Sequence, residues 1–398
     1  MRSDLWAERQ AQRRGPVTTG SYPSGQKPGS ERGWESQRTM TGAVLCLGID
    51  PQLIYSRRKK MRKVLLVTLI LALTLPLVLT GCGPAATPAP KKFKVGLVTD
   101  VGKVNDGTFN EFAYKGMMQA VNEFKLDSAF IETLAPTDYE KNITQFAEEK
   151  YDAIITVGFM IGDATAAMAK KYPNIKFTIV DYAYDPVIPN VIGLVFAEDQ
   201  SGFLAGALAG QMTKSKVVGI VCGKEIPPVV KFRKGYENGV KLVCPDCKVL
   251  GVYIDSFTAP DKGKEAALSQ IAEKADVIFG AGGPTGSGGI KAAAEKGVWV
   301  IGVDQDEYFT TFRDKKPGYD KLISSAMKRV DVAVYTAIKE AYQGTFKGRT
   351  AVFDATNDGV GLAPFHDADA AISKAIKDKL AEISKGMKEG KIQTGVKL

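Results

Sequence analysis

The chain has 398 residues, of which 44% are hydrophobic and 24% are charged, so it is long enough for two or more domains with sizeable cores. Its formal net charge of +9 is concentrated at the start, because residues 1–81 hold 13 basic and 5 acidic side chains and the remainder holds 40 and 39. This near-neutral remainder excludes nucleic acid as an expected partner and predicts no electrostatic surface for anionic lipid.

An apolar run near the N-terminus has the features of a secretory signal peptide. Basic residues precede it, and the run at 64–79 is about 16 residues long, shorter than the roughly 20 residues of a membrane-spanning helix. Residues 61–81 are therefore predicted to be a signal peptide. Met61 is then the expected true start, and residues 1–60 are a non-native or poorly ordered extension.

The end of this run resembles a bacterial lipobox, with the sequence Leu79-Thr80-Gly81-Cys82. In lipoproteins with this motif a peptidase cuts before the cysteine, which then carries the lipid. The resemblance implies lipidation at Cys82, attachment to the extracytoplasmic face of the cell membrane, and a flexible Pro/Ala-rich tether over residues 82–92. A membrane anchor with a chance cysteine is the alternative.

From Phe93 onwards, short apolar runs alternate with amphipathic segments. The runs are rich in Val and Ile with little alternation, as expected for strands buried on both faces of parallel sheets. Strands are predicted at 93–99, 152–157, 175–180, 190–196, 216–222, 248–254, 275–279 and 298–303. Helices are predicted at 109–124, 138–150, 160–171, 200–213, 228–242, 262–274, 287–296 and 328–343, with a C-terminal amphipathic segment at 367–389. The expected fold class is α/β, with two lobes that each hold a doubly wound parallel sheet flanked by helices.

Two capping-box patterns mark expected helix starts. They pair Thr108 with Glu111 and Thr137 with Glu140. In each box the threonine hydroxyl is expected to accept a backbone N–H of the first turn, while the glutamate bonds back to the cap residue.

The cysteines of the body are expected to have structural roles. Cys222 ends an apolar strand and is predicted to be buried. Cys244 and Cys247 form a CxxC pair between a helix and a strand. Zinc is not expected there, because there is no second CxxC and His366 is the only histidine. A local disulfide and two free thiols are the alternatives.

Aspartate follows or ends four of the predicted strands, at Asp100, Asp181, Asp255 and Asp304. Ligands of open α/β sheets bind beyond the carboxyl ends of strands. Each aspartate alone can be a helix cap or a turn former. Four of them in one chain favour a shared polar site, and carboxylates suit the vicinal hydroxyls of a sugar.

Two aromatic residues, Phe109 and Phe257, also follow strand ends, among turn-forming residues. The demands of an apolar core do not explain an aromatic side chain at such a polar corner. One ring from each lobe could hold a flat ligand between them by stacking. Alternatively, each ring closes the top of its own sheet.

The glycine-rich run GAGGPTGSGG, residues 280–289, matches neither the P-loop nor the dinucleotide-binding pattern. Close approach of the backbone to a ligand, or a flexible turn into the next helix, explains it better. A single histidine and the absence of nucleophile and metalloprotease motifs argue against catalysis. No catalytic residue, cofactor or metal is predicted, although paired carboxylates leave a glycosidase as an alternative.

Several stretches together resemble the bacterial basic membrane protein family of lipoproteins, which includes purine nucleoside receptors. They include VGLVTDVGKVNDGTFNEFAYKG, IITVGFMIGDA, GFLAGALAG, IFGAGGPTGSGG and VIGVDQDEY. The resemblance implies a two-lobed type I periplasmic-binding-protein fold with three crossings and the ligand in the cleft. Lobe 1 is then expected at 92–196 plus 326–345, and lobe 2 at 197–325 plus 346–398.

The resemblance also implies how the purine base is held. Phe109 and Phe257 would stack on the base from opposite lobes. Asp100, Asn110 and Asp181 would hydrogen-bond the base or its surroundings.

A second group matches the part of the family's site that holds the ribose. Asp304, Lys328 and the backbone at Gly282 are implied for this role. Lys328 has an alternative interpretation as a solvent-facing lysine on the last helix, so its role depends on the resemblance alone.

The function implied is that of a lipid-anchored, monomeric solute-binding protein that captures a purine nucleoside such as adenosine, guanosine or inosine. The closed form would dock on an ABC permease, and a separate ATPase would supply the energy. One alternative is the same fold binding another flat or sugar-like solute, or acting as a sensor. An extracellular nucleoside or glycoside hydrolase is the alternative from a different class.

Overall fold

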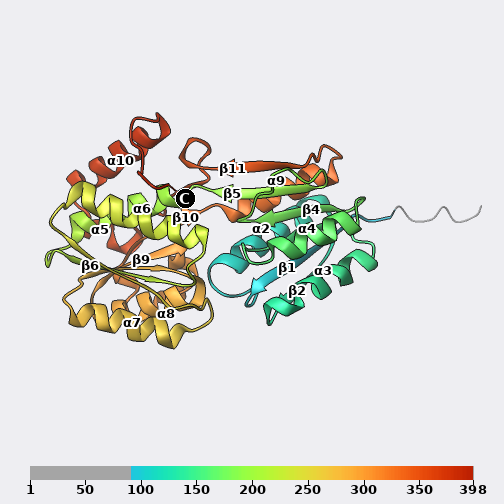
Figure 1. Ribbon diagram of the computed structural model, residues 1–398. Coiled ribbons are helices and arrows are strands. Elements are labelled where there is room, and N and C mark those ends of the chain that lie inside the picture. The colour runs from blue at the N-terminus through green and yellow to red at the C-terminus, as the bar shows by residue number, and fades with distance from the viewer. Residues whose placement is uncertain (1–90, 398) are drawn as a thin grey trace, which may run out of the picture. The chain divides into compact units, whose positions relative to one another are not determined.

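The computed structural model describes residues 91–397, so the predicted signal peptide, the extension before it and Cys82 lie outside the described residues. Two six-stranded sheets form the described part of the chain, with helices packed on their faces (Figure 1). We call the sheet that contains β1 and its helices lobe 1, and the other sheet with its helices lobe 2. Among the described residues, no helix has both the length and the apolar character needed to cross a lipid bilayer.

Lobe 1 contains a wholly parallel sheet in the order β11-β5-β4-β3-β1-β2. Its central strands are apolar and buried, as expected for strands covered on both faces. Its strands are β1 (Lys94–Val101), β2 (Asp127–Thr133), β3 (Ala153–Thr156), β4 (Lys176–Val180), β5 (Val191–Phe196) and β11 (Arg349–Phe353). Its helices are α2 (Phe109–Phe124), α3 (Tyr139–Glu148), α4 (Gly162–Lys171) and α9 (Val330–Tyr342).

Lobe 2 repeats this plan in the order β12-β10-β9-β8-β6-β7, with only β12 antiparallel to its neighbour. Its strands are β6 (Val217–Cys222), β7 (Lys248–Tyr253), β8 (Val277–Ala281), β9 (Trp299–Asp304), β10 (Leu322–Lys328) and β12 (Val360–Leu362). Its helices are α5 (Glu198–Met212), α6 (Pro227–Val243), α7 (Pro260–Ala272), α8 (Gly283–Glu295) and α10 (Lys374–Lys388). The expected α/β class with two doubly wound lobes is confirmed.

All eight predicted strands are present, each within two residues of its expected bounds. The four strands that the sequence analysis missed are polar or short. β2, with the sequence DSAFIET, is a partly exposed edge strand, and β11 and β12 are edge strands of five and three residues. β10, with the sequence LISSAMK, includes Lys328, so the helix expected at 328–343 begins two residues later, at Val330.

The chain passes between the two sheets three times, after β5, after β10 and after β11. The first passage agrees with the expected boundary at 196. The second differs, because residues 326–328 still belong to β10 in lobe 2. The third also differs, because β11 pairs with β5 and therefore lies in lobe 1 rather than in the expected segment 346–398 of lobe 2. The pairing of β11 with β5 could not be predicted from the residues around β11, because β5 is far away in the chain.

The predicted capping boxes are wrong in detail. At the start of α2 the carboxylate of Asp106, and not the hydroxyl of Thr108, accepts the first backbone N–H groups. The Thr108 hydroxyl is buried without a hydrogen-bond partner among the described residues. α3 begins at Tyr139, after a turn of 3₁₀ helix, so Thr137 does not cap it.

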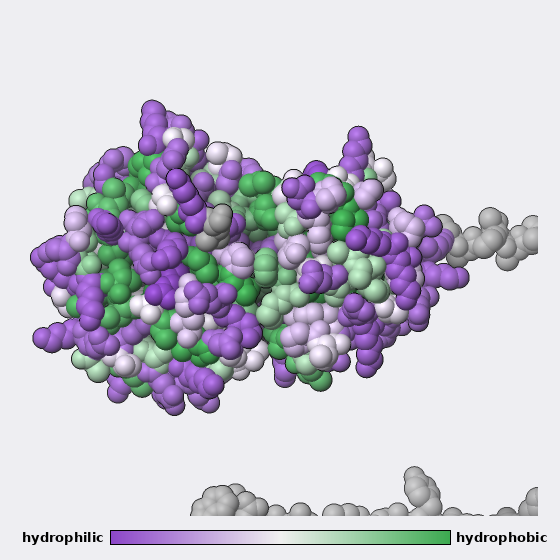
Figure 2. All heavy atoms as spheres, in the orientation of Figure 1, coloured by the Kyte–Doolittle hydropathy of each residue, from purple (hydrophilic) through white to green (hydrophobic). Residues whose placement is uncertain are grey.

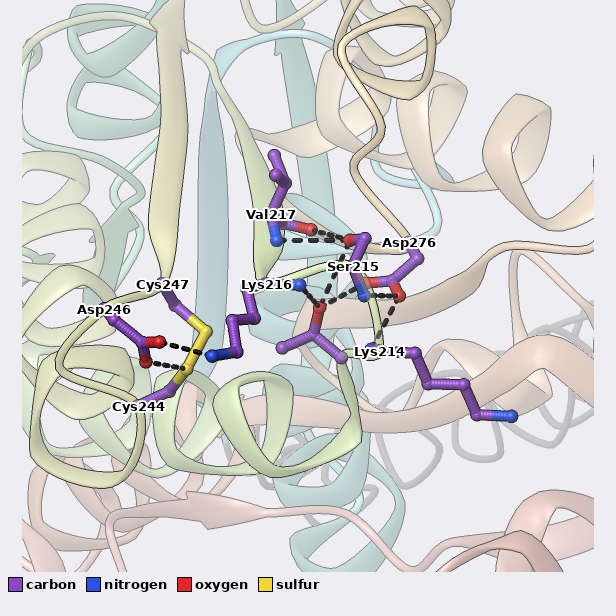
Figure 3. Close-up of a disulfide and its surroundings, with 9 residues drawn as sticks. Lys214, Ser215, Lys216, Val217, Cys244, Asp246, Cys247 and Asp276 are labelled. Carbon is purple, nitrogen blue, oxygen red and sulfur yellow. Dashed lines mark hydrogen bonds and ion pairs between the residues drawn. A yellow bond between two sulfur atoms is a disulfide. The ribbon is translucent and has the colours of Figure 1, made fainter.

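Cys244 and Cys247 form a disulfide in the turn between α6 and β7, which decides between the two alternatives (Figure 3). Lys216 and Asp246 form an ion pair beside it (Figure 3). Cys222 is fully buried in the core of lobe 2, as predicted. The disulfide lies at the amino-terminal end of β7, the opposite end of the sheet from the ligand-binding edge that the topology favours.

Candidate functional site

A cavity of about 410 Å³ lies at the carboxyl ends of strands from both sheets. β1 and β4 of lobe 1 and β8, β9 and β10 of lobe 2 all end at its wall. This is the edge at which parallel α/β sheets place their ligands, because there the strands give way to loops and helix starts. The volume is in the range of small-molecule sites.

All eight residues predicted from the sequence line this cavity. They are Asp100, Phe109, Asn110, Asp181, Phe257, Gly282, Asp304 and Lys328. The fourth acidic strand end, Asp255, does not line it. Asp255 is exposed, has a positive φ of 57° and forms a 3.0 Å ion pair with Lys224, so it is the turn former of the alternative interpretation.

Aromatic rings from both lobes form much of the wall. Phe109 is the first residue of α2, and Phe257 follows β7 in the other lobe. A Cβ atom at Gly223 would lie only 2.4 Å from the Phe257 ring, so a glycine there is needed to seat the ring. Two further rings at the wall, Phe159 and Phe232, were not predicted from the sequence. Phe159 follows an apolar strand and Phe232 lies within a helix, so nothing in the sequence distinguished them from core residues.

Asp100 is held in place by its own lobe. Its carboxylate accepts hydrogen bonds from the Tyr139 hydroxyl and, at 2.6 Å, from the N–H of Val101. Its own N–H donates to the side chain of Asn110. Gly158 has φ of 105°, and a Cβ there would lie 2.4 Å from the carboxylate. Burial raises the pKa of Asp100 to about 6, against the lowering effect of these hydrogen bonds.

Asn110 lines the cavity but is also committed to the loop before α2. Its amide nitrogen donates to Asp106 at 3.1 Å, and its oxygen accepts the N–H of Asp100 at 3.2 Å. Asn110 therefore holds Asp100 and Asp106 in position, whatever else it contacts.

Lys328 is the buried cation of the site, and not the solvent-facing lysine of the alternative interpretation. It ends β10, is 1% exposed, and lies 2.6 Å from a carboxylate oxygen of Asp181 and 3.0 Å from one of Glu198. Its nitrogen is also 5.0 Å from the centre of the Phe109 ring. Burial alone would lower the pKa of Lys328, but the surrounding carboxylates outweigh it and keep the lysine charged.

Two carboxylates keep acceptor atoms for a ligand. One oxygen of Asp181 is buried without a hydrogen-bond partner among the described residues, while the other pairs with Lys328. The side chain of Asp304 makes no hydrogen bond with a described residue, and burial raises its pKa to about 7. Both have positive φ, 70° and 65°, so each forms a turn and also faces the cavity. Hydroxyl or N–H donors of a ligand would satisfy them.

Direct contacts between the lobes close one side of the cavity. Gln305, just after β9, donates to the carbonyl of Thr108 at 3.1 Å and accepts from Lys115 at 2.7 Å. The hydroxyl of Thr310 donates to the carbonyl of Gly107 at 2.7 Å. The start of α2 therefore contacts the loop after β9 right beside Phe109 and Asp304. No pattern in the sequence indicated these contacts.

Buried carboxyls of raised pKa make the stability of the protein depend on pH. Asp100 and Asp304, with pKa values of about 6 and about 7 against 3.8 for the ordinary group, bind more protons in the folded than in the unfolded state between about pH 4 and pH 7. We expect their contribution to stability to fall as the pH rises through this window. In thermal unfolding, Asp304→Asn should lose less stability between pH 4 and pH 7 than the unsubstituted protein loses. An identical pH profile for the two proteins would contradict the assignment.

The sequence matches a family model over most of the described residues. The model, Bmp, describes PnrA-like substrate-binding proteins of ABC transporters and matches residues 93–394. A CD4+ T-cell-stimulating antigen of Listeria monocytogenes is 32% identical over 319 residues, 76% of this chain and 88% of that protein. BmpA of Lactococcus lactis, an ABC transporter nucleoside-binding protein, is 32% identical over 353 residues, 83% of this chain and 99% of BmpA. A lipoprotein of Pyrococcus abyssi is 30% identical over 355 residues, 83% and 86% of the two chains.

Solved structures show the same architecture. A solute-binding protein of an ABC transporter from Aeropyrum pernix superposes with a TM-score of 0.69 at 25% identity, over 76% of this chain and 92% of that one. GanP, a glucose-galactose binding protein from Geobacillus stearothermophilus, superposes with a TM-score of 0.52 at 17% identity, over 70% and 99% of the two chains. The fold is therefore of the type I periplasmic-binding-protein kind.

Proposed function

Because this chain belongs to the Bmp family of PnrA-like ABC transporter substrate-binding proteins, we propose that its cavity captures a purine nucleoside for import. The family consists of substrate-binding proteins of transporters and not of enzymes, which removes the hydrolase alternative. BmpA of Lactococcus lactis is a nucleoside-binding protein, and its similarity extends over almost its whole length. That similarity favours a nucleoside over the other solutes of the fold.

The observation that carries the proposal is the division of the cavity wall into an aromatic part and a carboxylate part. Phe109 and Phe257 offer flat apolar faces from the two lobes, which suit a heterocyclic base. Asp181 and Asp304 offer acceptor oxygens without partners among the described residues, which suit the two hydroxyls of a ribose or N–H groups of a base. A nucleoside combines a flat ring and vicinal hydroxyls in one molecule.

Within this proposal Lys328 and Asn110 act mainly through neighbouring carboxyl groups, whereas the resemblance implied that Lys328 holds the ribose and that Asn110 bonds the base or its surroundings. Asp100 would accept a hydrogen bond from the base, with Asn110 holding it in place. Lys328 would neutralise Asp181 so that its free oxygen can face the ligand. The backbone of Gly282 precedes α8, where N–H groups at the helix start can meet ribose oxygens.

Delivery and anchoring complete the proposal. Ligand binding would stabilise the closed arrangement of the lobes, and that form would dock, as a monomer, on an ABC permease powered by a separate ATPase. Lipidation at Cys82 would hold the protein at the extracytoplasmic face of the membrane, and the relative in Pyrococcus abyssi is a lipoprotein.

The experiment is a calorimetric titration of the chain from residue 83 onwards, after mass spectrometry of the denatured protein for a ligand that purified with it. We expect one-to-one binding of adenosine, guanosine or inosine, weaker binding of cytidine, and little binding of ribose alone. Each nucleoside should be recovered intact. Failure of every nucleoside to bind would overturn the proposal and favour another flat or sugar-like solute, and release of free base would contradict a binding protein.

A further inference from the structure

We propose that the end of lobe 1 at which the described chain begins is a docking surface for the phosphate headgroups of anionic lipids. We call it the basal face and define it by Lys91, Lys150, Lys171 and Lys176. The inference rests on the proposed lipid anchor at Cys82, because that anchor would hold this face close to a membrane.

The basal face is a hollow lined mainly by cations and aromatic rings. Its four lysines surround a surface cavity of about 510 Å³, together with Phe93, Tyr151 and Tyr172. Asp152 is the one acidic residue among those that line it. A concave surface that gathers several positive charges attracts anions, and a phosphate group is small enough to enter it.

Most of this charge is not neutralised within the protein. Lys91 forms a 2.7 Å ion pair with Asp152, but Lys150, Lys171 and Lys176 form no ion pair with a described residue. Glu149 and Asp127 do not line the hollow, but burial and the charges of these two acids raise the pKa of Tyr151 in its wall, so the two acids offset part of the positive charge. Three like charges around one cavity repel each other unless an anion lies between them.

The fold brings these lysines together from separate segments. Lys91 precedes β1, Lys150 follows α3, Lys171 ends α4 and Lys176 begins β4. A lysine near a helix end is favoured by the helix dipole, but this does not require four lysines around one hollow. The expectation of no surface for anionic lipid came from the total charge of the body, which cannot show how charges are distributed.

The position of the hollow favours a membrane over a soluble anion. The described chain enters lobe 1 at the end remote from lobe 2 (Figure 1), and hydrophilic side chains gather over that end (Figure 2). Eight residues lie between Cys82 and Lys91, so the two are at most about 30 Å apart. A lipid on Cys82 would therefore keep the basal face close to the headgroups. Lysines mixed with tyrosines, here with the 44%-exposed Tyr342 nearby, are typical of surfaces at the membrane interface.

The test measures binding of the unlipidated chain, from residue 83 onwards, to vesicles. This chain contains every described residue of both lobes. Vesicles of phosphatidylcholine with about one-third phosphatidylglycerol are compared with phosphatidylcholine alone by flotation. We expect binding only to the anionic vesicles, with a strong decrease at high salt. The triple substitution K150Q/K171Q/K176Q should weaken it about 10- to 100-fold.

A matched control separates the basal face from general attraction by charge. K262Q/K264Q/K291Q removes the same three charges from exposed lysines of α7 and α8 in lobe 2, which form no ion pair with a described residue. It should bind anionic vesicles like the unsubstituted chain. Equal weakening by both triple variants, or no binding by the unsubstituted chain, would overturn the proposal. If the first triple variant does not fold, the three single substitutions are measured instead. Each of them should weaken binding to anionic vesicles about three- to fivefold.

Two further measurements distinguish lipid binding at the basal face from binding of a soluble phosphate and from the proposed nucleoside binding. Release of the chain from vesicles by millimolar inorganic phosphate, at constant ionic strength, would assign the hollow to a soluble phosphate and overturn the assignment to lipid. Nucleoside titration of the basal-face variant should be unchanged, because its substitutions do not line the ligand cavity. Vesicle binding and nucleoside binding can therefore fail independently.

Discussion

Replacing Lys328 by methionine is expected to lower the free energy of unfolding by about 3–5 kcal/mol. Lys328 is the close cationic partner of two buried carboxylates, Asp181 at 2.6 Å and Glu198 at 3.0 Å. Methionine keeps most of the side-chain volume but leaves two acids without this partner in an apolar setting. Chemical denaturation at neutral pH, without ligand, measures the loss.

Two further variants test the cause of this effect. Lys231 also lies near Glu198, at 3.3 Å, but its side chain is 31% exposed, so Lys231→Met should cost about 1 kcal/mol or less. The double variant Lys328→Met with Asp181→Asn should recover part of the lost stability, because it removes one uncompensated charge. If the double variant is no more stable than Lys328→Met alone, the ion pair is not the source of the loss.

The same substitution tests the proposed role of Lys328 in binding. Without its charge, Asp181 and Asp304 should bind protons more readily, and the carboxylate acceptors offered to a ribose should be weakened. We expect lower nucleoside affinity in calorimetry at a temperature at which the variant is folded. Unchanged affinity would show that Lys328 supports the fold alone.

Phe109→Ala is expected to weaken purine nucleoside binding by roughly 5- to 150-fold, the range of about 1–3 kcal/mol found when an aromatic ring that stacks on a base is removed. Phe109 opens α2 at the cavity wall and faces a ligand together with Phe257 in our proposal. Ribose has no flat ring, so its affinity should change little. Titrations with inosine and ribose, with the unsubstituted protein and the variant in parallel, measure the difference.

The control for this variant is Phe309→Ala. Phe309 is 58% exposed and does not line the cavity, so its removal should leave nucleoside affinity unchanged. Phe257→Ala should resemble Phe109→Ala, because the two rings come from opposite lobes. Equal losses of affinity for inosine and ribose would contradict the stacking role. A large loss of nucleoside affinity in Phe309→Ala would indicate an indirect effect on the fold.

Much of the site could be predicted from the sequence because it lies at strand ends. Asp100, Asp181 and Asp304 follow or end apolar runs, and all three line the cavity. Asp255 has the same local pattern but does not line the cavity, because its side chain is exposed to solvent and pairs with Lys224. A local pattern gives the position of a residue along a strand but not the direction of its side chain.

The residues that the sequence analysis missed have their partners far away in the chain. Glu198 appears as an ordinary acid in the first turn of α5, and only β10 brings Lys328 beside it. Gln305 is polar and unremarkable until the other lobe supplies Thr108 and Lys115 as its partners. No sequence spacing encodes a contact across almost two hundred residues.

The sequence by itself determined the α/β class, the eight strands that are continuous apolar runs, the helices between them and the carboxyl-terminal edges at which a ligand would bind. It did so because buried parallel strands need continuous apolar runs and the turns after them need polar residues. The tertiary structure alone decided which strands are edge strands, where the chain passes between lobes, that Lys328 is buried, and that neutral composition still yields a basic face. All four of these features depend on which segments, distant in the chain, pack against each other. The burial of a residue and the clustering of charges follow from that packing and not from the residues that adjoin in the sequence.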